Sequence, residues 1–274
     1  MFDGGSALRL PGYRITGELH RSGVSIVYLA QDERLGRRVV VKTLREPLAA
    51  DRRFRERFLC ECRVAAGLDH PNIVPVYHFG DAGDTLFVVL PYIRGGDLQA
   101  LLDAHGPLPP RRAASIVAQA AAALDHIHER GLVHRDVKPK NVLLDSSSGS
   151  RAYLCDFGIT AGCHCPELEA IVSPGSVGFR APEQVAGQWV DRRADVYSLA
   201  CLLFACLTAA SPAGGGRVLG GLGAVVARGM ATDPRDRYPT CGDLAADLRS
   251  WVKVAQQVGG DLDDVVGVGD ALAV

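Results

Sequence analysis

A short polar run, His134-Arg135-Asp136-Val137-Lys138-Pro139-Lys140-Asn141, carries side chains suited to chemistry on phosphate. Asp136 is suited to accept a hydroxyl proton or to orient the hydroxyl, and Lys138 to neutralise charge on a phosphoryl group in transit. Asn141 offers an amide oxygen as a Mg²⁺ ligand. Asp156 follows twenty positions after Asp136, in Asp156-Phe157-Gly158, and offers a second hard oxygen ligand. These are the groups that phosphoryl transfer requires.

The composition makes some of these residues stand out. Only four of the 30 basic residues are lysines, at positions 42, 138, 140 and 253, and the two asparagines are at 72 and 141. A sequence that otherwise avoids lysine and asparagine keeps them at Lys42, Lys138 and Asn141. We therefore expect specific roles for these three residues.

The bulk properties describe an ordinary globular protein. The chain has 274 residues, 47% of them hydrophobic, which fits one large domain or two lobes that share a cleft. A formal net charge of -1 gives no indication of nucleic acid as a partner. Residues 1–11 lack a basic region followed by an apolar run, and the most apolar stretch, 196–210, is shorter than the ~18 residues of a membrane span. We expect a cytoplasmic protein without a membrane segment.

Eight cysteines are present, and in a cytosolic chain of this size they are expected to be reduced core thiols. Cys163-His164-Cys165 is the alternative, a metal-binding group. Its one-residue spacer is shorter than zinc sites usually have, and the sequence has no obvious matching second pair. The sequence therefore disfavours a metal at these three residues.

The positions of these residues depend on elements of two kinds. The first part of the chain predicts five strands and one helix, in the order 13–19, 25–30, 38–44, helix 51–68, 73–79 and 85–92. After Arg94-Gly95-Gly96 the pattern becomes helical, with helices at 109–130, 194–208, 221–230 and 241–254 and a short hairpin formed by 142–144 and 152–155. The fold class is α+β, a small β-rich lobe joined by one short connector to a larger helical lobe. A cleft between two such lobes is the expected ligand site.

Together with Ala181-Pro182-Glu183, these motifs resemble the eukaryotic-like serine/threonine protein kinases of bacteria, especially the actinobacterial receptor-type group. The resemblance covers about residues 13–251. It implies the bilobal kinase fold, with a small five-stranded antiparallel β lobe and one helix at 13–92, a larger, mainly helical lobe at 93–258, and tails at 1–12 and 259–274. It also implies transfer of the ATP γ-phosphoryl group, with Mg²⁺ or Mn²⁺, to serine or threonine hydroxyls of protein substrates. A second kinase chain in a dimer is a further candidate partner.

The resemblance assigns a role to each candidate site residue. Lys42 would pair with the α- and β-phosphates and with Glu61, and Asp136 and Lys138 would act in catalysis. Asn141 and Asp156 would hold the metal. Leu90 would be the gatekeeper, and the main chain of Pro91 and Ile93 would bond the adenine. Structural pairs are implied between Glu183 and Arg237, and between Asp195 and the backbone of the catalytic loop. The loop over the phosphates would include His20, Ser22, Gly23 and Val27.

Three segments depart from the family pattern. His20, Ser22 and Ser25 stand where the phosphate loop has glycines, which predicts weaker or altered nucleotide binding. The segment 159–180 lacks the usual paired threonines. There Glu167 and Glu169 could supply constant negative charge, and Ser173 and Ser176 are the remaining hydroxyls. Residues 209–220 are too short for the usual helix and long loops that dock partners.

These departures leave alternatives to an active protein kinase. A catalytically weak pseudokinase that acts as a scaffold is favoured by the altered phosphate loop and the lost docking element, and disfavoured by the intact set of charged and metal-binding residues. A small-molecule kinase of related fold is the second alternative. It is disfavoured by Lys138, by Ala181-Pro182-Glu183 and by the Asp233-Pro234 motif with Arg237.

Overall fold

The computed structural model describes residues 10–23, 25–44, 52–83, 85–147, 151–156, 178–214, 218 and 220–257. These residues divide into two compact units. The first comprises the residues up to Asp69 together with Val74–Tyr92, and the second comprises His70–Ile73 and the described residues from Ile93 onward. Each unit has its own architecture, and each carries part of the predicted site.

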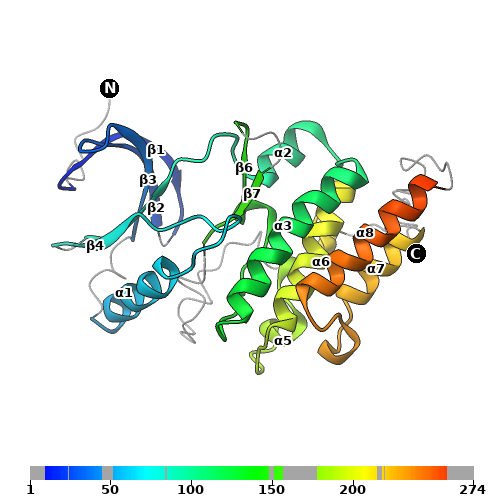
Figure 1. Cartoon of the computed structure of the whole chain (residues 1–274). Helices are drawn as coiled ribbons and strands as arrows, with labels where there is room; N and C mark the ends of the chain where they lie inside the picture. Colours follow the sequence, from blue (N-terminus) through cyan, green and yellow to red (C-terminus); the bar gives the residue numbers. More distant parts are fainter. Residues whose placement is uncertain are drawn as a thin grey trace. The chain divides into compact units, whose positions relative to one another are not determined.

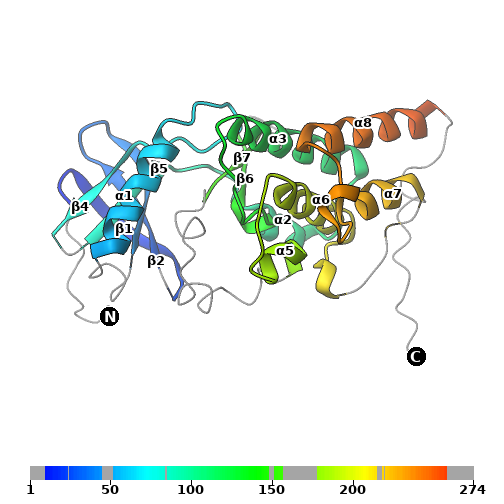
Figure 2. The same cartoon turned by 90° about the horizontal axis from the view of Figure 1, so that it is seen from below.

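The first unit is a five-stranded antiparallel sheet with one helix (Figure 1). The strand order is β1-β2-β3-β5-β4. Val39, Val41 and Val89 point into one small core because residues two apart on a strand share a face. Helix α1 contacts β4 (Figure 2). The elements are β1 (Tyr13–Arg21), β2 (Ser25–Asp32), β3 (Arg37–Leu44), α1 (Arg52–Ala66), β4 (His78–Ala82) and β5 (Thr85–Pro91).

The register of this sheet brings several predicted site residues into one row. Val27 of β2 lies opposite His20 of β1 and opposite Lys42 of β3, which lies opposite Val88 of β5. Residues directly opposite in an antiparallel pair project on the same face. The alternation that buries Val41 against the core therefore turns Lys42 to the other face, beside Val27 and His20.

One predicted strand is wrong. The structure starts β4 at His78, whereas the sequence pattern predicted a strand over 73–79. Pro75 has no N–H to give to a strand ladder, so Ile73 makes only an isolated bridge to Leu154. The predicted helix over 51–68 is confirmed as α1 over Arg52–Ala66.

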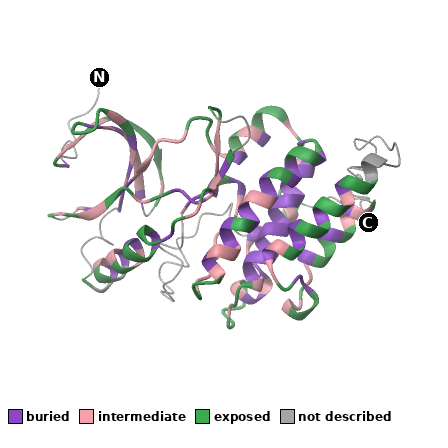
Figure 3. Ribbon diagram, in the orientation of Figure 1, coloured by how far each residue is buried: buried purple, intermediate pink, exposed green. Residues whose placement is uncertain are grey.

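The second unit is mainly helical and is built around one buried helix. Helix α6 (Arg193–Thr208) is buried along most of its length (Figure 3) and packs against α3, α7 and α8. This confirms the prediction from its uniformly apolar sequence, since a helix that is apolar all round needs neighbours all round. The longer helices around it are α3 (Pro110–His128), α7 (Gly220–Gly229) and α8 (Cys241–Gln257).

Shorter elements complete the second unit. Helix α2 (Leu98–His105) was not predicted, although Asp97 gives a usable signal: its side chain caps the helix by accepting the N–H of Ala100 at 2.8 Å. The predicted hairpin is confirmed as β6 and β7. These elements are η2 (Pro139–Asn141), β6 (Val142–Asp145), β7 (Arg151–Leu154), α5 (Pro182–Val185), η4 (Pro212–Gly214) and η5 (Pro234–Asp236).

The link between α6 and α7 is short, as the sequence indicated. Of its residues, the structure describes 209–214 and 218, which contain the single turn η4. Among the described helices, none combines the length and the apolar character that crossing a membrane requires.

Candidate active site

The loop between α3 and β6 brings two predicted catalytic residues and one predicted metal ligand into direct contact. The Nζ of Lys138 lies 2.7 Å from Oδ2 of Asp136 and 3.0 Å from its Oδ1. The Nδ2 of Asn141 donates to the same Oδ2 at 2.9 Å and to the main-chain oxygen of Asp136 at 2.7 Å. A main-chain oxygen can only accept, so the amide nitrogen of Asn141 must face it. This orientation leaves the Oδ1 of Asn141, the atom suited to Mg²⁺, outside these two bonds.

Asp195, at the start of α6, holds this loop from behind. One carboxylate oxygen accepts the N–H of His134 and the other accepts that of Arg135, each at 2.8 Å. The Asp195 side chain is fully buried, and the ring of His128 at the end of α3 contacts it at 2.7 Å. The predicted role of Asp195 is confirmed. His128 was not predicted, because a histidine in the last turn of a helix gives no distinct sequence signal.

The electrostatics around His128 favour positive charge. Burial alone would lower its pKa, but the interactions of His128 with the Asp125 and Asp195 carboxylates outweigh burial and raise the pKa to about 9. The same pair keeps the pKa of Asp195 below its usual value despite complete burial, because His128 bonds it. A buried carboxylate needs such partners to remain ionised.

Two residues of the loop region adopt strained backbone conformations. Arg135 has φ 67° and Asp156 has φ 59°. These values lie in the left-handed region, which residues other than glycine adopt uncommonly. Such strain costs about 1–3 kcal/mol and is typical of functional sites. The contacts of Cys155 hold the segment before Asp156, since its N–H donates to the Asn141 oxygen at 3.0 Å and its own oxygen lies 3.1 Å from the His134 ring. Phe157 and Gly158 lie outside the described residues.

In the first unit, Lys42 and Glu61 both act on one buried thiol. The pKa of Cys62 is raised to about 12, chiefly by burial and also by the Glu61 charge, while the Lys42 charge acts in the opposite direction. Glu61 and Lys42 are each partly buried, one on α1 and one on β3. Both charges therefore lie within electrostatic reach of Cys62. The ion pair between Lys42 and Glu61 stays a prediction.

The phosphate loop is closed by its serines. The main-chain N–H of Ser22 donates to the Ser25 oxygen at 2.9 Å, and the N–H of Ser25 donates to the Ser22 hydroxyl at 3.0 Å. The second bond occupies a main-chain N–H that would be free for phosphate if residue 22 were glycine, because glycine has no hydroxyl to accept it. Gly23 lies between them and His20 is exposed on β1, while Val24 lies outside the described residues.

Restoring glycine at His20, Ser22 and Ser25 is expected to strengthen nucleotide binding. The triple variant loses the Ser22 hydroxyl that accepts the N–H of residue 25, and so frees that N–H for phosphate. A gain equal to one net hydrogen bond, about 0.5–1.5 kcal/mol, corresponds to a Kd lowered about 2- to 12-fold. Titration of ATP into both proteins measures this change, and Ser147→Gly in an exposed turn is the control. An unchanged Kd in the triple variant would contradict the prediction.

The end of β5, which is predicted to bind adenine, comes just before the chain enters the second unit. Leu90 and Pro91 pair with Val40 and Val39 of β3, and both are partly buried at the end of β5. Pro91 has no N–H, so only its main-chain oxygen can bond a ligand. Ile93 begins the next described segment of the second unit.

The predicted pair of Glu183 and Arg237 is confirmed. Two guanidinium nitrogens of Arg237 donate to the two carboxylate oxygens of Glu183 at 2.6 and 2.7 Å. Their side chains are 0% and 7% exposed, which places the pair among the strong, bidentate class of ion pairs. Gln184 was not predicted; its amide donates to the Arg135 oxygen at 3.0 Å and so ties α5 to the catalytic loop.

The remaining sequence predictions for the segment 159–180 stay untested. Glu167, Glu169, Ser173 and Ser176 lie outside the described residues, as do Cys163, His164 and Cys165. The described part of that segment begins at Gly178.

Comparison with known proteins agrees with the arrangement of these residues. The model of the protein kinase domain family matches residues 13–220. The serine/threonine-protein kinase PknE of Mycobacterium tuberculosis is 38% identical over 267 residues, which cover 89% of this chain and 47% of PknE. PknD of the same organism is 37% identical over 269 residues, which cover 89% of this chain and 40% of PknD. The chain therefore spans about half the length of the curated relatives it matches.

A solved structure gives the same result for the fold. The kinase domain of Mycobacterium tuberculosis PknI is 33% identical, superposes with a TM-score of 0.74, and covers 90% of this chain and 99% of its own. The family match spans both units and includes Asp136 and Asn141, which bond each other, and Asp195, which holds the backbone of their loop. The chain belongs to the protein kinase family, as a relative of the mycobacterial serine/threonine-protein kinases.

Proposed function

We propose that this chain transfers the γ-phosphoryl group of ATP, in the presence of Mg²⁺ or Mn²⁺, to serine or threonine hydroxyls of protein substrates. The observation that carries the proposal is the bonded cluster of Asp136, Lys138 and Asn141 on a loop held by Asp195. Its relatives are serine/threonine-protein kinases by name, which supports the same class of acceptor.

The oxygen ligands present fit a hard divalent cation. The hydrogen bonds of Asn141 direct its nitrogen to Asp136, so its oxygen is the ligand it offers, and Asp156 adds a carboxylate. When bound between these residues and the phosphates, the cation would neutralise charge that develops on the transferred group. Lys42 would add positive charge at the α- and β-phosphates.

The residues of the loop have separable tasks in this proposal. Asp136 orients the substrate hydroxyl and accepts its proton as the hydroxyl oxygen bonds to the γ-phosphorus. The bond between that phosphorus and the bridging oxygen breaks, and ADP leaves with the bridging oxygen. Lys138, which is bonded to Asp136, would offset charge on the phosphoryl oxygens.

The serine-closed phosphate loop favours a second candidate, a pseudokinase that binds partners with little catalysis. The intact catalytic cluster supports the active enzyme instead. The two candidates differ in one measurable property, because only an enzyme forms a stable phosphate ester on its substrate.

Transfer of label from γ-labelled ATP to a generic protein substrate tests the proposal, with Mg²⁺ and with Mn²⁺. Wild-type protein is expected to label serine and threonine, as phosphoamino-acid analysis would show. Lys42→Met and Asp156→Asn are each expected to reduce the labelling rate at least about 100-fold, the size of effect found when an electrostatic group of an active site is removed. Equal labelling by wild type and both variants would assign the label to a contaminant and contradict the proposal.

A further inference from the structure

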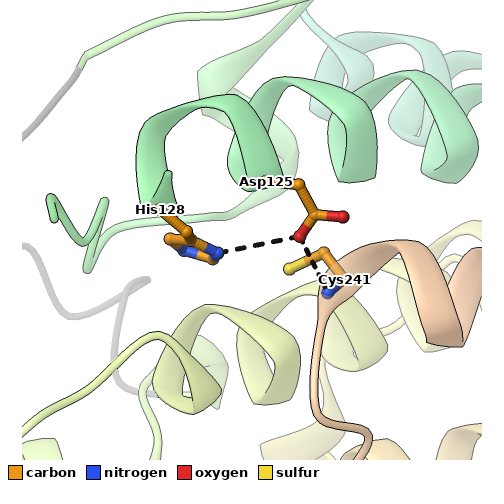
Figure 4. Close-up of side chains that lie close together, drawn as sticks. All are labelled: Asp125, His128 and Cys241. Carbon is orange, nitrogen blue, oxygen red and sulfur yellow. Dashed lines mark hydrogen bonds and ion pairs between the residues drawn. The ribbon is translucent and has the colours of Figure 1, made fainter. Parts of the chain in front are cut away.

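A second group of side chains with metal-ligand chemistry lies behind the catalytic loop. Asp125 and His128 project from the last turns of α3 toward Cys241, the first residue of α8 (Figure 4). Each offers one ligand atom, and the three atoms lie within 4.8 Å of one another. The Nδ1 of His128 is 3.8 Å from the Oδ1 of Asp125.

His128 is oriented as a metal ligand would be. Its Nδ1 is buried and has no hydrogen-bond partner among the described residues, and its side chain is only 4% exposed. Its Nε2 is 2.7 Å from the carboxylate of Asp195. Metal-binding histidines almost always bond a carboxylate or carbonyl through their second nitrogen, which fixes the ring and directs the first nitrogen to the metal.

We propose that Asp125, His128 and Cys241 form a binding site for Zn²⁺. One thiolate, one imidazole and one carboxylate make a ligand set that zinc accepts and that Mg²⁺ or Ca²⁺ does not. Zinc bonds of about 2.0–2.3 Å place tetrahedral ligand atoms roughly 3.3–3.8 Å apart. Ligand atoms now within 4.8 Å of one another would need to close by about 1.5 Å at most.

The charges that face the group favour a cation. Asp125 and Asp195 are the carboxylates nearest the site, and Arg192 is the positive side chain whose charge reaches Cys241. Asp125 also caps α8, since its Oδ1 accepts the N–H of Cys241 at 3.1 Å and its Oδ2 that of Gly242 at 2.8 Å. A carboxylate has about four acceptor positions, so these two bonds leave room for a metal bond on Oδ1.

A proton on His128 is the competing way to place positive charge between the two carboxylates. In that case Asp125 and His128 would only join α3 to α8 and to Asp195, and Cys241 would be a core thiol. The two interpretations differ in whether the sulfur becomes a ligand, which can be measured directly.

Titration of the full chain with Co²⁺, a spectroscopic substitute for Zn²⁺, is the test. The protein carries Cys163→Ser and Cys165→Ser, because those residues offer a second thiol pair. We expect an absorption band from thiolate-to-cobalt charge transfer that saturates at one Co²⁺ per chain. Asn141 and Asp156 offer only oxygen and contribute nothing to this band. Cys241→Ser is expected to abolish the band. Cys206→Ser, which changes a buried thiol on a different helix, α6, is expected to keep the band.

Thermal unfolding with Zn²⁺ gives an independent readout. At a hundredfold excess over Kd, Zn²⁺ is expected to raise the Tm by about 5 °C or more, and Asp125→Asn, which keeps a capping oxygen for α8, is expected to remove most of the rise. If Cys241→Ser fails to fold, the Tm measurement with Asp125→Asn still tests the proposal. A folded protein without the cobalt band, a band unchanged by Cys241→Ser, or a Tm rise unchanged by Asp125→Asn would each overturn the proposal.

Discussion

Asp136→Asn is expected to lower kcat about 100- to 10,000-fold while changing the Tm by no more than a few degrees. The rate loss is the usual contribution of a positioned acid–base group. Among the described residues, the ammonium of Lys138 and the amide of Asn141 donate to the Asp136 carboxylate. Asparagine offers one oxygen and one NH₂ group, so at least one of these partners would face a donor. The variant therefore loses both the proton acceptor and the geometry of its neighbours.

Steady-state phosphorylation of a generic protein substrate, with Tm measured in parallel, checks this prediction. Asp97→Asn is the matched control: Asp97 caps α2, and asparagine caps helices about as well as aspartate. We expect this control to keep both the rate and the Tm. A rate loss of less than about tenfold in Asp136→Asn, with the protein folded, would mean that another group positions the hydroxyl.

The sequence was most informative where one residue type fits one task. Asp136, Lys138 and Asn141 were identified because acidic, basic and amide groups at these spacings serve one reaction, and the structure joins them by hydrogen bonds. The buried helix α6 was likewise predictable, since an apolar sequence without a polar face can be stable only when it is enclosed.

The local sequence pattern was less informative where contacts between distant residues determine the structure of a segment. The apolar residues after Asn72 predicted a strand, but Pro75 breaks the ladder and Ile73 joins the second unit instead. Asn72 itself is fixed from far along the chain, because its amide donates to Gln119 and to the Ala152 oxygen, each at 2.9 Å. No local window contains that information.

The same limit explains the missed site residues. His128 and Asp125 matter because α3 ends beside α6 and α8, and the ends of three helices coincide only in the folded chain. The bonds between Ser22 and Ser25 were missed for another reason. Substituted glycines predict lost flexibility, but they do not indicate that the new side chains close the loop on itself.

Arg237→Met is expected to lower the free energy of unfolding by about 3–5 kcal/mol, the cost of breaking a buried ion pair. Within the described residues, Arg237 is the side chain that bonds the Glu183 carboxylate, and it also donates to the main-chain oxygens of Ala231 (2.7 Å), Arg193 (3.0 Å) and Thr232 (3.1 Å). Removing the guanidinium thus leaves a buried negative charge and three carbonyls without their donor. Urea unfolding followed by far-UV circular dichroism measures the loss.

Three further variants separate charge burial from lost packing. Arg235→Met, two residues away, removes an exposed ion pair with Asp233 and is expected to cost far less than Arg237→Met, because solvent screens exposed charges. Glu183→Leu is expected to cost less than Arg237→Met, because the three carbonyls continue to solvate the guanidinium. The double variant Glu183→Leu/Arg237→Met is expected to be more stable than Arg237→Met alone, since it removes the orphaned carboxylate. If Arg237→Met lowered the free energy of unfolding no more than Arg235→Met does, the buried ion pair would stabilise the fold no more than the exposed one, which would contradict the prediction.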